Sequence, residues 1–288
     1  MAPDFSGVVA DVEISLLGPF IIRAGGVNLG PTAPKPRQVL ALLAMHANQV
    51  VSVSALIREL WDEDPPRSAL ATLQTYILQL RRLLATTPGI RSSAVSNELL
   101  ITSAGGYLLR LDPELLDLHR FERLATEGRT ALARNDDERA GWVLREALAE
   151  WRGQPLVDVH AGPLLRFHLV RLEEARLTAL EHRFEADLRI GLHREVLSEL
   201  AFLAAQHPLH ENLHAELMVA LYRSGRRSEA LTVFHRMRAR LVDELGLEPS
   251  MKMQRIQQAI LATAPGLDVP QRRSSLAISA FAPTAVVW

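Results

Sequence analysis

Apolar and polar residues alternate with helical periodicity between Arg67 and Leu84. One apolar stripe consists of Leu73, Ile77, Leu80 and Leu84, which follow one another at steps of four, three and four residues. At about 100° per residue, the opposite face carries Ser68, Ala71, Thr72, Thr75, Gln79 and Arg82. From Pro65 to Asn97 the chain contains four arginines and no Asp or Glu. The pattern predicts a helix that suits a DNA major groove, although an ordinary amphipathic helix with a solvated basic face has the same pattern.

Short extended runs and two further helices are predicted before this segment. The strand-like runs are Val12–Leu17, Phe20–Arg23 and Val27–Leu29, and they predict an antiparallel sheet of two or three strands. A helix is expected to begin at Pro34–Pro36, because proline is tolerated in the first helical turn. A second, short helix is expected over Ala55–Trp61, with Ser54 as its N-cap.

Two extended runs follow the central helix. Leu99–Thr102 and Tyr107–Leu111 alternate in polarity and are joined through Gly105 and Gly106, which predicts a hairpin. A sheet, three helices and a terminal hairpin in this order form a winged helix-turn-helix. The third helix then enters the groove and the hairpin serves as the wing.

The pattern changes at Asp117, where strand signals stop and helical periodicity continues to about Ala262. Predicted helices cover Leu118–Ala133, Glu138–Trp151, Leu164–Arg189, Glu195–His207, Glu211–Ser224, Ser228–Leu245 and Met251–Leu261. Gly191 and Glu195 recur as Gly225 and Glu229 at a spacing of 34 residues, the period of tetratricopeptide helix pairs. Such pairs stack and leave a concave face for a partner.

The predicted fold class is therefore mainly α. A winged helix-turn-helix with small antiparallel sheets is followed by an all-α, tetratricopeptide-like helical domain. The expected organisation is a flexible N-terminus over residues 1–11, a DNA-binding domain over 12–112, a helical domain over 113–264 and a flexible tail over 265–288.

Composition narrows the function classes. At 288 residues the chain is long enough for two domains, and its net charge of −1 requires any nucleic-acid affinity to come from a local patch. The absence of Cys excludes disulfides, thiolate nucleophiles and Cys-ligated zinc. The N-terminus does not read as a signal peptide, and the longest apolar run falls short of the ~20 residues of a membrane helix. We therefore expect a cytoplasmic, nucleoid-associated protein without a membrane partner.

Several strings resemble one known family. KPRQVLALL, LIRELWDEDPPRSALATLQTYILQLRRLL and GGYLLRL are similar to the DNA-binding domain of the Streptomyces antibiotic regulatory protein (SARP) family, a response-regulator-type winged helix. PLHENLHAELMVALYRSGRRSEAL and LVDELGLEPS resemble its bacterial transcriptional activation domain. The resemblance covers Val12 to Ala262. It implies a sequence-specific activator of a secondary-metabolite (antibiotic) gene cluster.

The resemblance also implies partners. The expected ones are double-stranded promoter DNA carrying tandem direct repeats, a second protomer in a homodimer on that DNA, and RNA polymerase through its sigma factor or alpha subunit. No cofactor is expected.

The resemblance carries candidate DNA-binding residues onto this chain. On the central helix and just before it, they are Arg67, Ser68, Thr72, Thr75, Tyr76, Gln79, Arg81 and Arg82. On the first two helices and the wing, they are Lys35, Arg37, Trp61, Thr102, Ser103, Gly105 and Tyr107. Trp61 and Tyr76 fit core packing equally well, and Arg81 fits a phosphate contact better than a base contact. Because the wing tip carries no Arg or Lys, only a hydrogen bond from Thr102 or Ser103 is expected there.

Two other classes of function stay open. His210, Glu211 and His214 spell H-E-x-x-H, the pattern of a zinc hydrolase, but the usual third ligand does not follow at a known spacing. We therefore expect no metal site and no enzyme. The other alternative is a helical-repeat scaffold whose first domain binds protein instead of DNA.

Overall fold

A computed structural model describes residues 12–85 and 99–268. The chain forms two compact units, Met1–Arg183 and Phe184–Trp288. The segments 1–11 and 269–288, for which flexibility is predicted, lie outside the described residues, as does the stretch 86–98. The boundary expected at residues 112–113 stays a prediction, because the first compact unit continues through it to Arg183.

The first sheet is antiparallel, as the sequence predicts. It consists of β1 (Val12–Ser15), β2 (Ile21–Ala24) and β3 (Val27–Asn28), in that order. Gly25 and Gly26 connect β2 to β3 with φ values of 56° and 80°. Both values lie in the left-handed region that a tight hairpin turn requires and that glycine adopts without strain. Ile14 and Ile22 pair across the sheet and are buried.

Three helices follow and confirm the helix-turn-helix. They are α1 (Pro34–Met45), α2 (Val53–Trp61) and α3 (Ala69–Ala85). The predicted N-cap of α2 is wrong by two residues. Ser52 holds that position, because its hydroxyl accepts a hydrogen bond from the N–H of Ala55 at 3.1 Å and the helix begins at Val53.

The wing is part of a second sheet. β5 (Leu100–Ser103) and β6 (Gly106–Leu109) form the predicted hairpin, and β4 (Val50–Ser52) pairs with β6 on its other edge. β4 is not among the strands that the sequence predicts. The pairing fixes the wing to the segment that leads into α2.

Within the described residues, three further α-helices begin in the first unit, and the last of them continues past the boundary of the unit at Arg183. η1 (Pro113–Leu115) leads into α5 (Asp117–Ala133), which packs against α6 (Asp137–Ala149), and α7 (Pro163–Arg189) follows. Gly128 allows α5 and α6 to approach closely, because a Cβ at this position would lie 2.5 Å from Leu144 Cγ. The observed bounds agree with the predicted helices to within two residues at each end.

Two buried carboxylates join the winged helix to these helices within the first unit. Glu59, on α2, accepts hydrogen bonds from N–H groups at the start of α7. The donors are Gly162, Leu164 and Leu165, at 2.6, 2.9 and 3.1 Å. Four N–H groups at a helix start lack partners within the helix, so Glu59 acts as the cap of α7 from a distant part of the chain.

Asp117, at the start of α5, makes the reciprocal connection. Its carboxylate accepts hydrogen bonds from the N–H groups of Leu16 (2.8 and 2.9 Å) and Leu17 (3.0 Å), just after β1. Burial raises the pKa of the Asp117 carboxyl, and these N–H groups and the Arg152 charge act in the opposite direction. Each half of the unit thus supplies a buried acid that binds backbone of the other half.

The second unit is helical. It contains α8 (Leu197–Gln206), α9 (Glu211–Arg223), α10 (Arg227–Arg240), a π-helical turn η2 (Leu241–Leu245), α11 (Met251–Ala262) and η3 (Pro265–Leu267). No helix among the described residues is both long and apolar enough to cross a membrane.

The 34-residue repeat is visible in the backbone of this unit. Gly191 and Gly225 both end helices in the left-handed conformation, with φ values of 90° and 79°. The next residues, Leu192 and Arg226, donate to the carbonyl oxygens of Asp187 and Leu221, both at 2.9 Å. The two helix ends therefore have the same kind of C-cap, and each residue of one cap lies 34 residues from its equivalent in the other.

Candidate nucleic-acid interface

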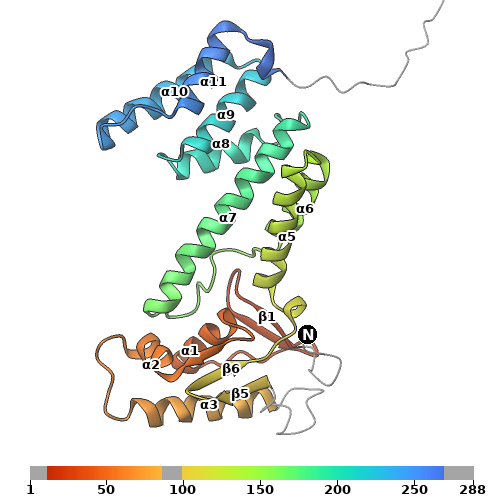
Figure 1. Cartoon of the computed structure of the whole chain (residues 1–288). Helices are drawn as coiled ribbons and strands as arrows, with labels where there is room; N and C mark the ends of the chain where they lie inside the picture. The colour runs from red at the N-terminus through yellow and green to blue at the C-terminus, as the bar shows by residue number, and fades with distance from the viewer. Residues whose placement is uncertain (1–11, 86–98, 269–288) are drawn as a thin grey trace, which may run out of the picture. The chain divides into compact units, whose positions relative to one another are not determined.

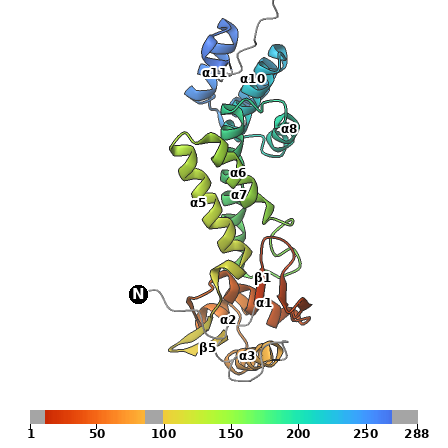
Figure 2. The ribbon, with the colours of Figure 1, turned by 90° about the vertical axis from the view of Figure 1, so that its right-hand side faces the viewer.

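The α3 helix has one buried and one exposed side. The buried side consists of Ala69, Leu73, Ile77, Leu80 and Leu84 and packs into the core of the first unit. The exposed side consists of Leu70, Ala71, Gln74, Thr75, Leu78, Gln79 and Arg82. Figures 1 and 2 show that α1 and α2 lie on one side of α3 and that β5 runs beside it. The predicted division of this helix into an apolar stripe and a polar, cationic face is therefore present.

The exposed face offers unused hydrogen-bonding groups. The side chains of Gln79 and Arg82 make no hydrogen bond or ion pair with any residue that the structure describes, and the same holds for the side chain of Arg67 just before the helix. The Thr75 hydroxyl donates to the carbonyl oxygen of Ala71 at 3.0 Å, which leaves its lone pairs as acceptors. Ser68 is exposed and its carbonyl oxygen accepts from the N–H of Thr72, a half-buried residue.

Arg81 points away from this face and holds the wing. Its Nε and Nη2 atoms donate to the carbonyl oxygen of Leu100 at 2.9 and 2.8 Å, and Nη2 also donates to Thr102 Oγ1 at 2.8 Å. The guanidinium therefore ties the last turn of α3 to strand β5. Its neighbour Arg82 is exposed, so two adjacent arginines have different roles.

Lys35 and Trp61 lie together at one end of the first two helices. The Lys35 ammonium donates to the carbonyl oxygen of Leu60, and its nitrogen lies 5.8 Å from the centre of the Trp61 ring. Trp61 is half-buried and packs against the core. The pair joins the start of α1 to the end of α2.

Arg37 is bound within the first unit. Its guanidinium donates to the carbonyl oxygen of Phe20 at 2.7 Å, forms an ion pair with Asp158 and lies 5.2 Å from the centre of the Phe20 ring. This arrangement connects α1 with the first sheet and with the segment that follows α6. Arg37 therefore stabilises the frame of the domain.

The wing residues have distinct surroundings. Gly105 forms the turn with a φ of 78°, and its carbonyl oxygen accepts from the N–H of Val53 at 3.0 Å. A Cβ at Gly106 would lie 2.2 Å from the Val51 carbonyl oxygen, so only glycine fits there. Thr102 is exposed, Ser103 is half-buried and Tyr107 is buried in the core. The half-buried Tyr76 on α3 packs against the same core.

Sequence reasoning missed three residues on the exposed face of α3, Leu70, Gln74 and Leu78. Gln74 lies three residues after Ala71, and Leu78 lies three residues after Thr75, so helical spacing alone could have placed both on this face. Leu70 is 49% exposed and Leu78 is 48% exposed, so both offer apolar contacts beside the polar groups of this face.

The H-E-x-x-H residues have structural roles in the second unit. The Glu211 carboxylate accepts a hydrogen bond from the backbone N–H of Ser250, which precedes α11. His214 Nδ1 donates to the carbonyl oxygen of His210 at 3.0 Å. Among the described residues, no group of three or more His, Asp or Glu side chains is arranged to hold a metal ion.

Two family profiles match the chain. One is described as "Transcriptional regulatory protein, C terminal" and matches residues 30–109, from just before α1 to the end of β6. The other is described as "Bacterial transcriptional activator domain" and matches residues 116–261, from α5 into α11, including the His210–His214 stretch. Together with the winged helix and its exposed α3 face, these matches define a winged-helix transcriptional regulator that carries an activator domain.

Individual relatives give the family. The chain is 50% identical to the regulatory protein DnrI of Streptomyces peucetius over 257 residues. This alignment covers 89% of this chain and 94% of DnrI. It is 39% identical over 261 residues to the transcriptional regulator RedD of Streptomyces coelicolor, which covers 90% of this chain and 73% of RedD. A solved structure of Mycobacterium tuberculosis EmbR in complex with a low affinity phosphopeptide matches with a TM-score of 0.83 and 32% identity, over 92% of this chain and 67% of that one. The chain belongs to the Streptomyces antibiotic regulatory protein family of transcriptional activators.

Proposed function

We propose that the chain binds promoter DNA in a sequence-specific manner by placing α3 in the major groove. The observation that carries this proposal is the exposed face of α3, where Gln79 and Arg82 have no partner among the described residues. Glutamine can bond two atoms of an adenine edge, and arginine binds phosphate or guanine. No Asp or Glu occurs between Pro65 and Asn97 to repel the phosphates.

The contacts divide into reading and positioning. Thr75, Gln79 and Gln74 supply the hydrogen bonds to base edges, and Leu78 contacts a thymine methyl group. Arg67, Ser68 and Arg82 bind phosphates before and after the reading face, and Thr72 supports them from its half-buried position. These contacts fix the register of the helix in the groove.

The remaining predicted residues support this surface. Lys35 and Trp61 fit a backbone contact at the ends of α1 and α2, and the wing offers the exposed Thr102 hydroxyl and the turn at Gly105, with Ser103 half-buried beside them. Tyr76 and Tyr107 contribute through packing, Arg37 through the frame and Arg81 through the position of the wing.

The proposal also covers the DNA site, the oligomeric state on DNA and the protein that the bound regulator recruits. Two protomers bind tandem direct repeats side by side, and the bound dimer recruits RNA polymerase through its sigma factor or alpha subunit. Family membership supports this part, since DnrI and RedD are regulators of closely similar sequence. We propose that the genes controlled form an antibiotic biosynthetic cluster.

Two substitutions test the docking. DNA selected by the parent protein from a random pool serves as the ligand, and affinity is measured by fluorescence anisotropy over a range of salt concentrations. Gln79→Ala is expected to relax preference at one base pair, with a loss of about 1–3 kcal/mol on the selected site. Arg82→Ala is expected to weaken binding to all sequences and to lower the slope of log K against log salt by about 0.9.

Arg134→Ala is the matched control for charge, because Arg134 is exposed at the end of α5. It is expected to bind like the parent. Parent-like binding by both α3 variants would disprove the docking of α3. A parent protein with no preference for any DNA sequence would instead favour the helical-repeat scaffold.

A further inference from the structure

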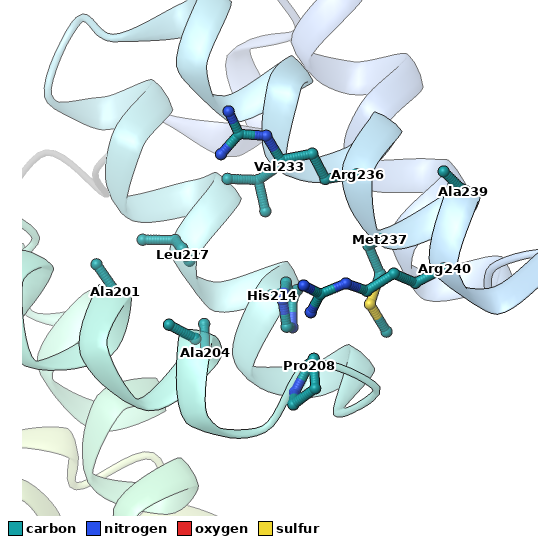
Figure 3. Close-up of a pocket in the computed structure, with 11 residues that line it drawn as sticks. Ala201, Ala204, Pro208, His214, Leu217, Val233, Arg236, Met237, Ala239 and Arg240 are labelled. Carbon is teal, nitrogen blue, oxygen red and sulfur yellow. The ribbon is translucent and has the colours of Figure 1, made fainter. Parts of the chain in front are cut away.

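A cavity of about 510 Å³ lies among α8, α9 and α10 in the second unit (Figure 3). Its wall is largely apolar and includes Ala204, Leu217, Val233 and Met237. Cavities of about 300–1,000 Å³ with apolar walls and a few placed polar groups are the usual form of small-molecule sites. No Asp or Glu is among the described residues that line it.

Two arginines on one face of α10 supply the charge of this cavity. Arg236 and Arg240 are four residues apart and both line it, so they share a face of the helix with Met237. Neither guanidinium forms a hydrogen bond or ion pair with the residues that the structure describes.

The other arginines of α10 are engaged elsewhere. Arg227 donates to the carbonyl oxygen of Leu261 at 2.8 Å, and Arg238 forms an ion pair with Glu248 at 2.7 Å. The helix therefore leaves without partners the two cations that face the cavity.

His214 adds a polar ring to the wall of the cavity. In Figure 3 the guanidinium of Arg240 extends toward the His214 ring. Burial lowers the pKa of His214 and the charge of Arg240 lowers it further, while the hydrogen bond to His210 acts in the opposite direction. Arg240 is a permanent positive charge at this end of the cavity.

Like charges four residues apart on a helix repel each other. An anion between them removes the repulsion, and a carboxylate matches the planar donor pattern of guanidinium. We propose that this cavity binds a small organic acid, with its apolar body against Ala204, Leu217 and Met237 and its carboxylate paired with Arg236 and Arg240.

A second hollow of about 290 Å³ has Leu197 and Leu221 in its wall, together with the Arg226–Glu229 ion pair. It shares Ala201, Leu217, Val233 and Arg236 with the first cavity, so the two adjoin. Because Arg236 lines both, it lies where they meet. The site therefore fits an acid with an extended apolar body.

The test uses the full chain and three probes. Anilinonaphthalene sulfonate carries an apolar body and an anion, phenylnaphthylamine carries the same rings without the anion, and decanoate is the competing carboxylate. The parent is expected to bind both fluorescent probes, and decanoate is expected to displace them at about tenfold lower concentration than decanol does, because only decanoate pairs with the arginines. The double variant Arg236→Gln/Arg240→Gln is expected to bind the sulfonate and decanoate at least about tenfold more weakly than the parent does, because charge-assisted hydrogen bonds are lost. Its affinity for phenylnaphthylamine is expected to equal that of the parent.

Arg238→Gln is the control for loss of an arginine on the same helix, with one charge removed instead of two, and it is expected to leave all affinities unchanged. Circular dichroism reports folding of each variant. If the double variant is unfolded, the variant Ala201→Phe tests the proposal instead. Ala201 is an exposed residue in the cavity wall, so a phenylalanine there narrows the cavity and is expected to lower the affinity for both fluorescent probes.

Several results would overturn the proposal. One is that decanoate does not displace the probes from the parent, and another is that the double variant loses equal affinity for the charged and the neutral probe. The others are that Arg238→Gln lowers affinity as much as the double variant does, or that Ala201→Phe binds the probes like the parent. Tight binding of an acidic helical peptide without competition by decanoate would show a protein-docking groove instead.

Discussion

α3 and α10 each combine an apolar stripe with several arginines, and they use these arginines differently. On α3 the engaged arginine, Arg81, holds the wing, while Arg82 stands on a face of amides and hydroxyls. On α10 the engaged arginines are Arg227, which donates to Leu261, and Arg238, which pairs with Glu248, while Arg236 and Arg240 stand beside an apolar cavity. The side chains around an arginine without a partner determine which kind of ligand it is suited to bind. A polar exposed face suits the phosphates and bases of a duplex, and an apolar hollow suits a single small anion.

The largest expected effect concerns the frame that holds α3. Glu59→Ala removes the acceptor for three N–H groups at the start of α7 and leaves a buried gap. We expect a loss of about 3–5 kcal/mol in the free energy of unfolding of the first unit. Urea denaturation checks it, with separate probes for the two units. An equal loss in the unit that contains α10 would show that the two helices do not rest on independent frames.

The engaged arginines give the next largest effect and compare the two helices directly. Arg81→Ala breaks charged hydrogen bonds to Leu100 and Thr102, and we expect a loss of about 1.5–3 kcal/mol in stability. Arg238→Ala breaks an exposed ion pair and is expected to leave the melting temperature unchanged within error.

Salt titration separates Arg81 from Arg82. If Arg81 acts only by placing the wing, Arg81→Ala lowers DNA affinity without changing the salt slope, whereas Arg82→Ala lowers the slope. Equal slopes for the two variants would mean that both arginines bind phosphate and that the division of roles on α3 is incorrect.

The smallest effect is a pH dependence of the first unit. His46 and His168 contact through their Nε2 atoms at 2.9 Å, and burial, His46 and Arg171 lower the pKa of His168 to about 4. The unfolded chain therefore takes up this proton first as the pH falls below 6.5. Stability from this group is complete above pH 6.5 and is lost between pH 6.5 and 4.

Partial exposure screens the shift, so we expect a loss of about 1 kcal/mol over that range. Denaturation of the parent and of His168→Gln at several pH values measures it. The variant is expected to have the flatter pH profile in the first unit, and parallel profiles would show that the pair does not titrate as described.

Sequence periodicity predicted much of this fold. Helix bounds from α5 to α11 and the two faces of α3 follow from local spacing of apolar residues, and the first sheet has three strands where two or three were predicted. The capping turn at Gly191 and Gly225 follows from the 34-residue repeat, because a left-handed C-cap requires glycine at the same place in each unit.

Contacts between distant residues were not predictable in this way. Asp117 meets Leu16 across 101 residues, and Glu59 meets Gly162 across 103. Nothing in the local pattern around Arg37 or Arg81 shows that Asp158 or Leu100 is the partner. For the candidate site, sequence identified the helix and its polar face, while the three-dimensional structure separates the arginines that hold the fold from those left for a ligand.

The Glu59 and Asp117 contacts bear on how the chain can be divided. A fragment that ends at residue 112 would keep the Glu59 carboxylate but lose every α7 amide that binds it, and the Leu16 and Leu17 amides would lose Asp117. We therefore expect the winged helix and the first helices of the activator domain to fold as one cooperative unit. A chimera that joins the winged helix of one family member to the activator domain of another therefore has to keep Glu59, Asp117 and the backbone amides that bind them as matched pairs.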